Sequence, residues 1–135
     1  MSNSKEIIGG EVRFGGRAVP LSWAVRAGDF VFVSGIVACD DNGILSLGGD
    51  IGEQTQLALR FIQKRLMEAD CDLGDVAKVS VFLKNPDDFE SFNEVYAGFF
   101  PEQPPARITV TGGFVVEGAL VEIEVTAYKP RVSEK

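Results

Sequence analysis

Hydrophobic and polar residues alternate in short segments near both ends of the chain, which is the pattern of half-buried β-strands. Alternation predicts a strand over residues 18–25, with Leu21, Trp23 and Val25 on one side. A wholly apolar run predicts a second, buried strand over residues 30–35, and Arg26–Asp29 between them predicts a hairpin turn. Further strands are predicted over residues 76–83, 107–111 and 120–128.

Two segments between these strands change to the spacing of a helix. Apolar residues recur every three or four positions over residues 50–69, with Asp50 and Glu53 at the start, where the helix dipole favours carboxylates. Asn85-Pro86 predicts the start of a second helix, with an apolar stripe that includes Phe89 and Tyr96. The order ββαβαββ predicts one α+β domain over residues 1–135, with both helices packed on one face of a sheet.

The composition excludes several kinds of chemistry. The 135 residues include no histidine, so histidine-based nucleophile systems, imidazole acid–base catalysis and His-liganded zinc are excluded. Cys39 and Cys71 form no CxxC pair, and we expect both to be buried thiols in a reducing compartment. Any catalysis must then use carboxylates, arginine, hydroxyls, backbone groups and water.

The charge balance argues against nucleic acid as a partner. The net charge is −7, and no three basic residues are adjacent, whereas a nucleic-acid binder needs a basic surface. No apolar run is long enough for a membrane helix, and the first residues have no apolar leader. We therefore expect a cytoplasmic protein without membrane contact. Four Gly-Gly pairs lack the fingerprint of phosphate loops, and we interpret them as turns.

Candidate chemistry lies on the last two predicted strands. Arg107 and Thr109 share one face of the first strand, and Glu122 and Glu124 share one face of the second. If the alternate, apolar residues of both strands meet the helices, these polar groups share the opposite face. That face is either a solvated surface with a weak cross-strand ion pair, or a pocket in which the guanidinium grips a small anion.

Two other positions have alternative interpretations. Asn93 interrupts the apolar stripe of the second helix, so its amide needs a partner, either neighbouring backbone or a ligand. Ser34-Gly35 ends a buried strand and is either a simple strand terminus or a place where a ligand reaches bare backbone.

Four segments in order resemble the Rid family, the reactive intermediate deaminases also called RidA/YjgF. They are AVRAGDFVFVSG at 24–35, Asp88-Phe89 with NEVY at 93–96 and Phe99-Phe100, Pro105-Ala106-Arg107, and VEIE at 121–124. The resemblance extends from about residue 20 to 128. It implies a chorismate-mutase-like α+β fold, assembled as a homotrimeric barrel with clefts between subunits. It also implies hydrolysis of enamines and imines, such as 2-aminoacrylate, to 2-keto acids and ammonia, without metal or organic cofactor.

The resemblance also implies roles for individual residues. Arg107 matches the arginine that anchors the substrate carboxylate, and Glu122 the glutamate that activates water, with Glu124 as a weaker substitute. Ser34, Gly35 and Asn93 match residues that line the cleft.

Three cleft positions depart from the pattern of the typical deaminases. Leu21 stands where they have tyrosine, Trp23 where a polar residue is common, and Thr109 where cysteine is frequent. These departures predict a bulkier or catabolic substrate. The alternatives are a non-catalytic trimer that binds 2-keto or 2-imino acids, and a ribonuclease, against which the negative charge argues.

Overall fold

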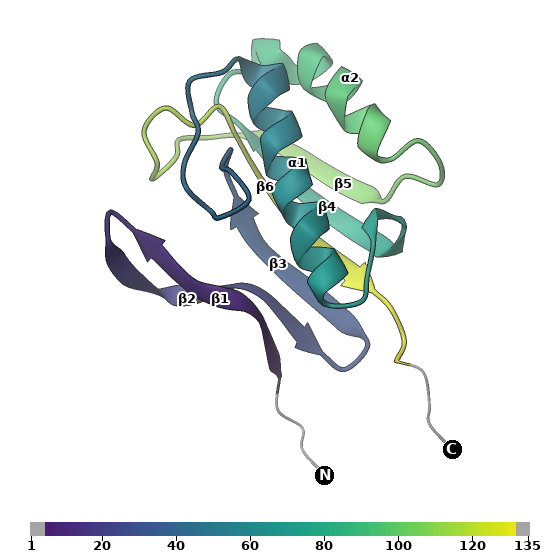
Figure 1. Cartoon of the computed structure of the whole chain (residues 1–135). Coiled ribbons are helices and arrows are strands. Elements are labelled where there is room, and N and C mark those ends of the chain that lie inside the picture. Colours follow the sequence, from purple (N-terminus) through teal and green to yellow (C-terminus); the bar gives the residue numbers. More distant parts are fainter. Residues whose placement is uncertain (1–4, 132–135) are drawn as a thin grey trace.

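Six strands form a single sheet in the computed structural model, which describes residues 5–131. The strand order is β1-β2-β3-β6-β4-β5, and only β4 and β5 run parallel (Figure 1). The strands are β1 (Glu6–Phe14), β2 (Arg17–Ala27), β3 (Phe30–Ile36), β4 (Val76–Leu83), β5 (Ala106–Thr111) and β6 (Val121–Tyr128). The predicted α+β class is confirmed.

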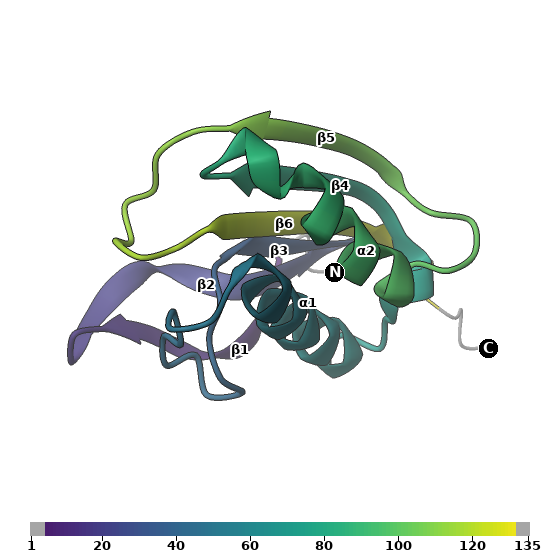
Figure 2. The same ribbon diagram turned by 90° about the horizontal axis from the view of Figure 1, so that it is seen from above.

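Both helices lie on one face of this sheet, as predicted (Figure 2). Helix α1 (Ile51–Glu68) packs on the first three strands and β6, and helix α2 (Phe89–Phe99) packs beside α1. Asp50 and Glu53 form a reciprocal capping box at the start of α1, so the acidic residues there satisfy free backbone N–H groups. Short 3₁₀ turns, η1 (Leu73–Asp75) and η2 (Pro86–Asp88), precede β4 and α2. Within residues 5–131, no helix is long and apolar enough to cross a membrane.

Strand β1 was absent from the sequence prediction. Its Gly9-Gly10 pair was interpreted as a turn, but both glycines lie inside the strand. Gly9 has a φ of +86°, and a Cβ there would lie 3.1 Å from the Trp23 ring, so glycine permits both the bulged strand and the close approach of the indole. The missing side chains removed the alternation by which the strand would have been recognised.

The predicted hairpin turn at residues 26–29 and the predicted burial of both cysteines are confirmed. Gly28 has a φ of +61° in the β2–β3 hairpin, and the Asp40 carboxylate accepts the backbone N–H groups of Asn42 and Ile44 in a tight turn. Cys39 and Cys71 are both free and buried. Burial raises the pKa of the Cys39 thiol to about 12.

A buried glutamine connects two loops, β3–α1 and β5–β6, at one end of the sheet. The Gln54 side chain, on α1, is fully buried, and its amide donates to the carbonyls of Leu47, Gly49 and Gly118. Its oxygen accepts from the backbone N–H of Leu120 at 2.9 Å. Gln54 therefore fixes the segment that leads into β6.

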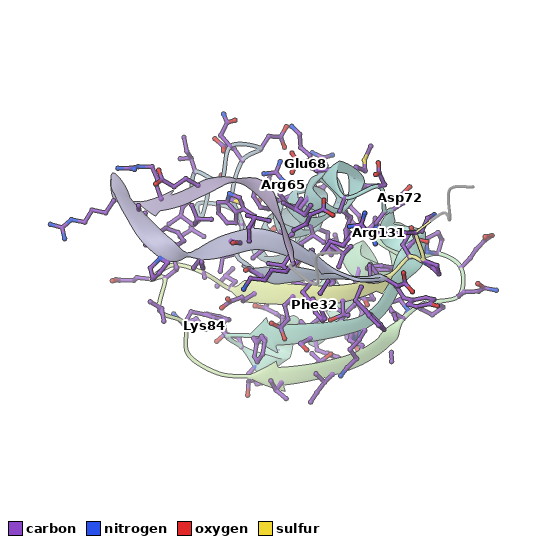
Figure 3. The ribbon with its side chains drawn as sticks, turned by 90° about the horizontal axis from the view of Figure 1, so that it is seen from below. Phe32, Arg65, Glu68, Asp72, Lys84 and Arg131 are labelled. Carbon is purple, nitrogen blue, oxygen red and sulfur yellow. The ribbon has the colours of Figure 1, made fainter. Side chains whose placement is uncertain are left out.

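The face of the sheet away from the helices carries exposed apolar side chains among polar ones such as Ser80 and Glu124, so the predicted burial of the strand over residues 30–35 is wrong for this face. The side chain of Phe32 lies there and is 46% exposed (Figure 3). Strand register places five more exposed apolar side chains on the same face: Phe30, Phe82, Ile108, Val110 and Tyr128. An exposed apolar surface of this extent is typical of a protein–protein interface.

Candidate functional site

Arg107 lies under helix α2. It pairs in register with Val79 of β4, whose buried side chain faces the helices. Its guanidinium donates to Oδ1 of Asn93 at 2.8 Å, so the amide that interrupts the apolar stripe of α2 finds its partner in this arginine and not in neighbouring backbone. One amino group of the Arg107 guanidinium is therefore already hydrogen-bonded to Asn93.

Aromatic rings of α2 surround the same guanidinium. Its central carbon lies 4.6 Å from the ring centre of Tyr96, 5.3 Å from that of Phe92 and 5.8 Å from that of Phe89. Such cation–π contacts favour the charged group and restrict its orientation. Burial raises the pKa of Tyr96, and the neighbouring Arg107 opposes that rise, so the phenol stays neutral beside the cation. An adjoining hollow of about 550 Å³ is lined by Thr109 and Phe89.

Glu122 lies on the opposite face of the sheet. It pairs in register with Phe82, and its neighbours Val121 and Ile123 are the residues that face the helices. The expectation that Arg107 and Glu122 share a face is therefore wrong. On β6 the apolar residues do meet the helices, but on β5 the apolar Ile108 and Val110 belong to the exposed apolar face.

The absence of a side chain at Gly35 provides the space that the Glu122 carboxylate occupies. A Cβ built on Gly35 would lie 2.3 Å from Oε2 of Glu122, closer than any real contact. Burial raises the pKa of Glu122, and the neighbouring charge of Glu124 raises it further. A glutamate with a raised pKa holds a proton closer to neutral pH, as a general acid–base group requires.

The Glu122 carboxylate borders a hollow of about 370 Å³ that contains four more of the predicted site residues: Leu21, Trp23, Ser34 and Gly35. The Ser34 hydroxyl donates to the carbonyl of Ser22 at 2.5 Å, so its proton is already engaged. Trp23 is buried and packs edge-on against Phe61 of α1, with ring centres 4.7 Å apart, whereas Leu21 is 46% exposed. The remaining lining comes from Phe14, Val37, Val115 and Val116.

The predicted residues thus form two separate groups. Arg107, Asn93 and Thr109 lie on the helix side at the β5 edge, and the Glu122 group lies around the far end of β3. Sequence reasoning found Leu21 and Trp23 in the wall of the Glu122 hollow but missed Phe14 and Val115, which come from a strand end and a loop without a periodic pattern. The aromatic stripe of α2 was recognised, but only as core.

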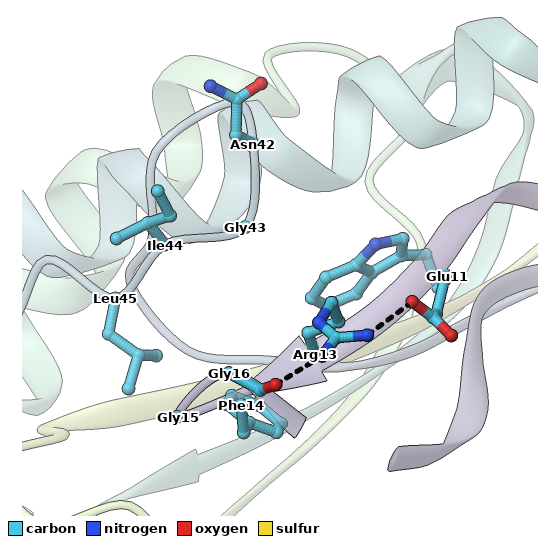
Figure 4. A pocket seen from close by; sticks show the side chains of 10 residues that line it. Glu11, Arg13, Phe14, Gly15, Gly16, Asn42, Gly43, Ile44 and Leu45 are labelled. Carbon is cyan, nitrogen blue, oxygen red and sulfur yellow. Dashed lines mark hydrogen bonds and ion pairs between the residues drawn. The ribbon is translucent and has the colours of Figure 1, made fainter. Parts of the chain in front are cut away.

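A larger hollow of about 560 Å³ lies outside this group, between the tip of the β1–β2 hairpin and the turn at Gly43 (Figure 4). Its charged residues, Glu11 and Arg13, are exposed and form an ion pair at 2.8 Å. Because these charges satisfy each other in solvent, neither is comparable to the half-buried carboxylate of Glu122.

Comparison with known proteins identifies deaminases among the proteins to which this chain is similar. The chain is 39% identical over 105 residues to 3-aminoacrylate deaminase RutC of Acinetobacter baylyi, covering 78% of this chain and 83% of that protein. It is 31% identical over 108 residues to human 2-iminobutanoate/2-iminopropanoate deaminase, covering 80% and 79%.

A solved structure extends the similarity to three dimensions. The crystal structure of E. coli TdcF with bound serine matches with a TM-score of 0.79 and 28% identity, covering 92% of this chain and 98% of that one. The family described as Endoribonuclease L-PSP matches residues 16–129. The chain therefore belongs to the Endoribonuclease L-PSP family, which is the Rid (YjgF/RidA) family that its sequence resembles.

Proposed function

We propose that this protein is a cofactor-independent deaminase that hydrolyses 2-imino acids and their enamine tautomers to 2-keto acids and ammonia. The observation that carries the proposal is that the chain holds both an oriented guanidinium and a carboxylate of raised pKa, and its relatives include two deaminases. The expected substrates include those of the 2-iminobutanoate and 2-iminopropanoate type.

Arg107 would hold the substrate carboxylate. Its guanidinium is anchored by Asn93 on one amino group and by the Tyr96 ring on one face, so the unoccupied N–H groups keep a fixed direction. A fixed fork can donate two parallel hydrogen bonds to a carboxylate. The carboxylate also makes the adjacent imine carbon more electrophilic, so anchoring it places the reacting atom.

Glu122 would position and activate the attacking water. The water oxygen forms a bond to the imine carbon while Glu122 accepts a proton from the water. The same carboxyl group returns that proton to the imine nitrogen, which gives a carbinolamine. It then moves the remaining proton from the new hydroxyl group to the amino nitrogen, the C–N bond breaks, and ammonia leaves as the C=O bond forms. A carboxyl group whose pKa is raised by burial is suited to both proton transfers.

The two groups would meet between subunits of a homotrimer. Arg107 and Glu122 lie on opposite faces of the sheet, so a substrate small enough to touch both needs them supplied by different chains. The surfaces that must meet differ from each other, and such head-to-tail contacts give a closed ring when the rotation from one subunit to the next closes. The exposed apolar face around Phe32 supports this assembly, since association would remove it from water.

The activity is tested with imines generated in situ by an amino acid oxidase and trapped by semicarbazide. Wild-type protein should suppress trapping and release keto acid, and Arg107→Ala and Glu122→Ala should not. A wild-type protein that binds 2-keto acids but suppresses no trapping would instead favour the non-catalytic binding protein that Leu21 and Thr109 suggest.

A mixing experiment tests the shared cleft. Arg107→Ala and Glu122→Ala, each inactive alone, are co-expressed and purified as mixed assemblies. About a quarter of the clefts should then combine an intact arginine with an intact glutamate, if the two halves come from different chains drawn at random. A site within one chain would leave the mixture inactive.

A further inference from the structure

The hollow beside Glu122 has walls that are almost wholly apolar. Glu122 is the one charged residue among the described residues that line it, and the hydroxyl proton of Ser34 is engaged by the Ser22 carbonyl. The other side chains are aliphatic or aromatic and come from β1, β2, the end of β3 and the β5–β6 loop: Phe14, Leu21, Trp23, Val37, Val115 and Val116. Any part of a ligand that extends beyond the Glu122 carboxylate would therefore contact apolar side chains.

Three of these side chains are unusually available for contact. Leu21 is 46% exposed and Phe14 is 37% exposed, although both point into a hollow, and Val115 is fully exposed on its loop. Exposed apolar side chains around a concave site favour binding of an apolar ligand group, because the ligand removes their surface from water. The Trp23 side chain is a rigid part of this wall, because its ring packs between Phe61 and Gly43.

We infer that this wall selects substrates by their side chain, and that the preferred imines carry a branched aliphatic or aromatic group instead of a methyl group or an exocyclic methylene. This inference rests on the proposed function and specifies its substrate class. With Glu122 at the imine carbon, the side chain of the substrate lies against Leu21 and Val115.

The size of the expected preference in kcat/KM follows from the number of extra carbon atoms that the larger substrate buries. Each additional methylene buried in an apolar pocket favours the larger substrate by roughly tenfold or more in kcat/KM. The leucine-derived imine carries three more carbons than the alanine-derived imine. We therefore expect wild-type protein to prefer the leucine-derived imine by at least about tenfold, even with part of the wall exposed to water.

The test compares these two imines in the trapping assay, with wild type, Leu21→Asn and Leu45→Asn. Leu21→Asn replaces wall carbon by an amide of similar size and should reduce the preference to about threefold or less, mainly through the leucine-derived substrate. Leu45→Asn is the matched control, because Leu45 is also exposed but does not line this hollow, and it should leave the preference unchanged.

A binding measurement keeps the inference separable from catalysis. The matched keto acids, 4-methyl-2-oxopentanoate and pyruvate, are titrated by calorimetry into the same three proteins. Tighter binding of the branched acid, lost only in Leu21→Asn, supports the inference even where no turnover is seen. Equal binding and equal hydrolysis in wild type would overturn the inference while leaving the deaminase proposal intact. A preference that survives Leu21→Asn, or falls equally in Leu45→Asn, would also overturn it.

Discussion

Gly35→Ala separates the position of the Glu122 carboxylate from the stability of the fold. A Cβ at Gly35 would lie 2.3 Å from Oε2 of Glu122, and real contacts of this kind stay beyond 3.0 Å. The carboxylate must therefore move by at least about 0.7 Å. A misplacement of about 1 Å at a reacting group costs on the order of 100-fold in rate, so we expect kcat to fall by between about 10-fold and 100-fold.

The fold should tolerate the same change. The colliding atom is the far end of a flexible side chain, and Gly35 does not have a positive φ, so alanine introduces no backbone strain. The free energy of unfolding, measured by urea titration, should change by less than about 1 kcal/mol. Gly74→Ala is the matched control, since a Cβ there meets nothing within 4 Å, and its activity should equal that of wild type.

A double-mutant cycle tests whether the loss acts through Glu122. Glutamine at position 122 keeps the size of the side chain but removes the ionisable group, so Gly35→Ala should lower the residual activity of Glu122→Gln by less than about threefold. An equal loss in both backgrounds would refute the reasoning, because Gly35 would then act independently of the carboxylate. So would a Gly35→Ala protein that keeps more than half of the wild-type kcat.

Four further predictions follow from the same structure. Glu124→Gln should move the acidic limb of the pH profile of kcat/KM to lower pH, because it removes the neighbouring charge that raises the pKa of Glu122, while burial keeps the limb above that of an ordinary glutamate; an unchanged limb would contradict this. Phe32→Glu places a charge on the exposed apolar face and should dissociate the proposed trimer with loss of activity, as measured by light scattering and the trapping assay. Cys39, with a thiol pKa of about 12, should react with a thiol reagent only when the protein unfolds; rapid labelling of the native protein would count against it. Gln54→Leu leaves three backbone carbonyls and one backbone N–H without their side-chain partner. It should lower the free energy of unfolding by about 3 kcal/mol or more. A loss under about 1 kcal/mol would show that water replaces the amide.

The secondary structure was predictable where side chains of one kind persist through an element. Residues 76–83 are rich in β-branched and other apolar side chains, and the predicted strand coincides with β4. The predicted helix over residues 50–69 agrees with α1, because the apolar stripe and the Asp50 cap both indicate the same start of the helix. Strand β1 escaped prediction because Gly9-Gly10 removes two side chains from the pattern, and only the contact with Trp23 explains why glycine belongs there.

The face of the sheet on which each candidate residue lies was less predictable than the strand or helix that carries it. Alternation identifies which residues share a face of one strand, but it does not identify which face of an edge strand meets the helices. For β5 the apolar face looks outward, so Ile108 and Val110 are exposed and Arg107 lies under α2. Asn93 was the available signal, because an amide inside an apolar stripe needs a polar partner on the helix side, and Arg107 provides it.

The division of the site and the exposed apolar face are consistent with a single assembly. A monomer that kept Arg107 and Glu122 on one face would need no partner for catalysis, and an apolar face around Phe32 would then only promote aggregation. With the two groups on opposite faces, the burial that joins the subunits would also bring the guanidinium to the carboxylate. Each cleft would then be completed by association, and the loss of the apolar contact would abolish catalysis without altering any catalytic residue.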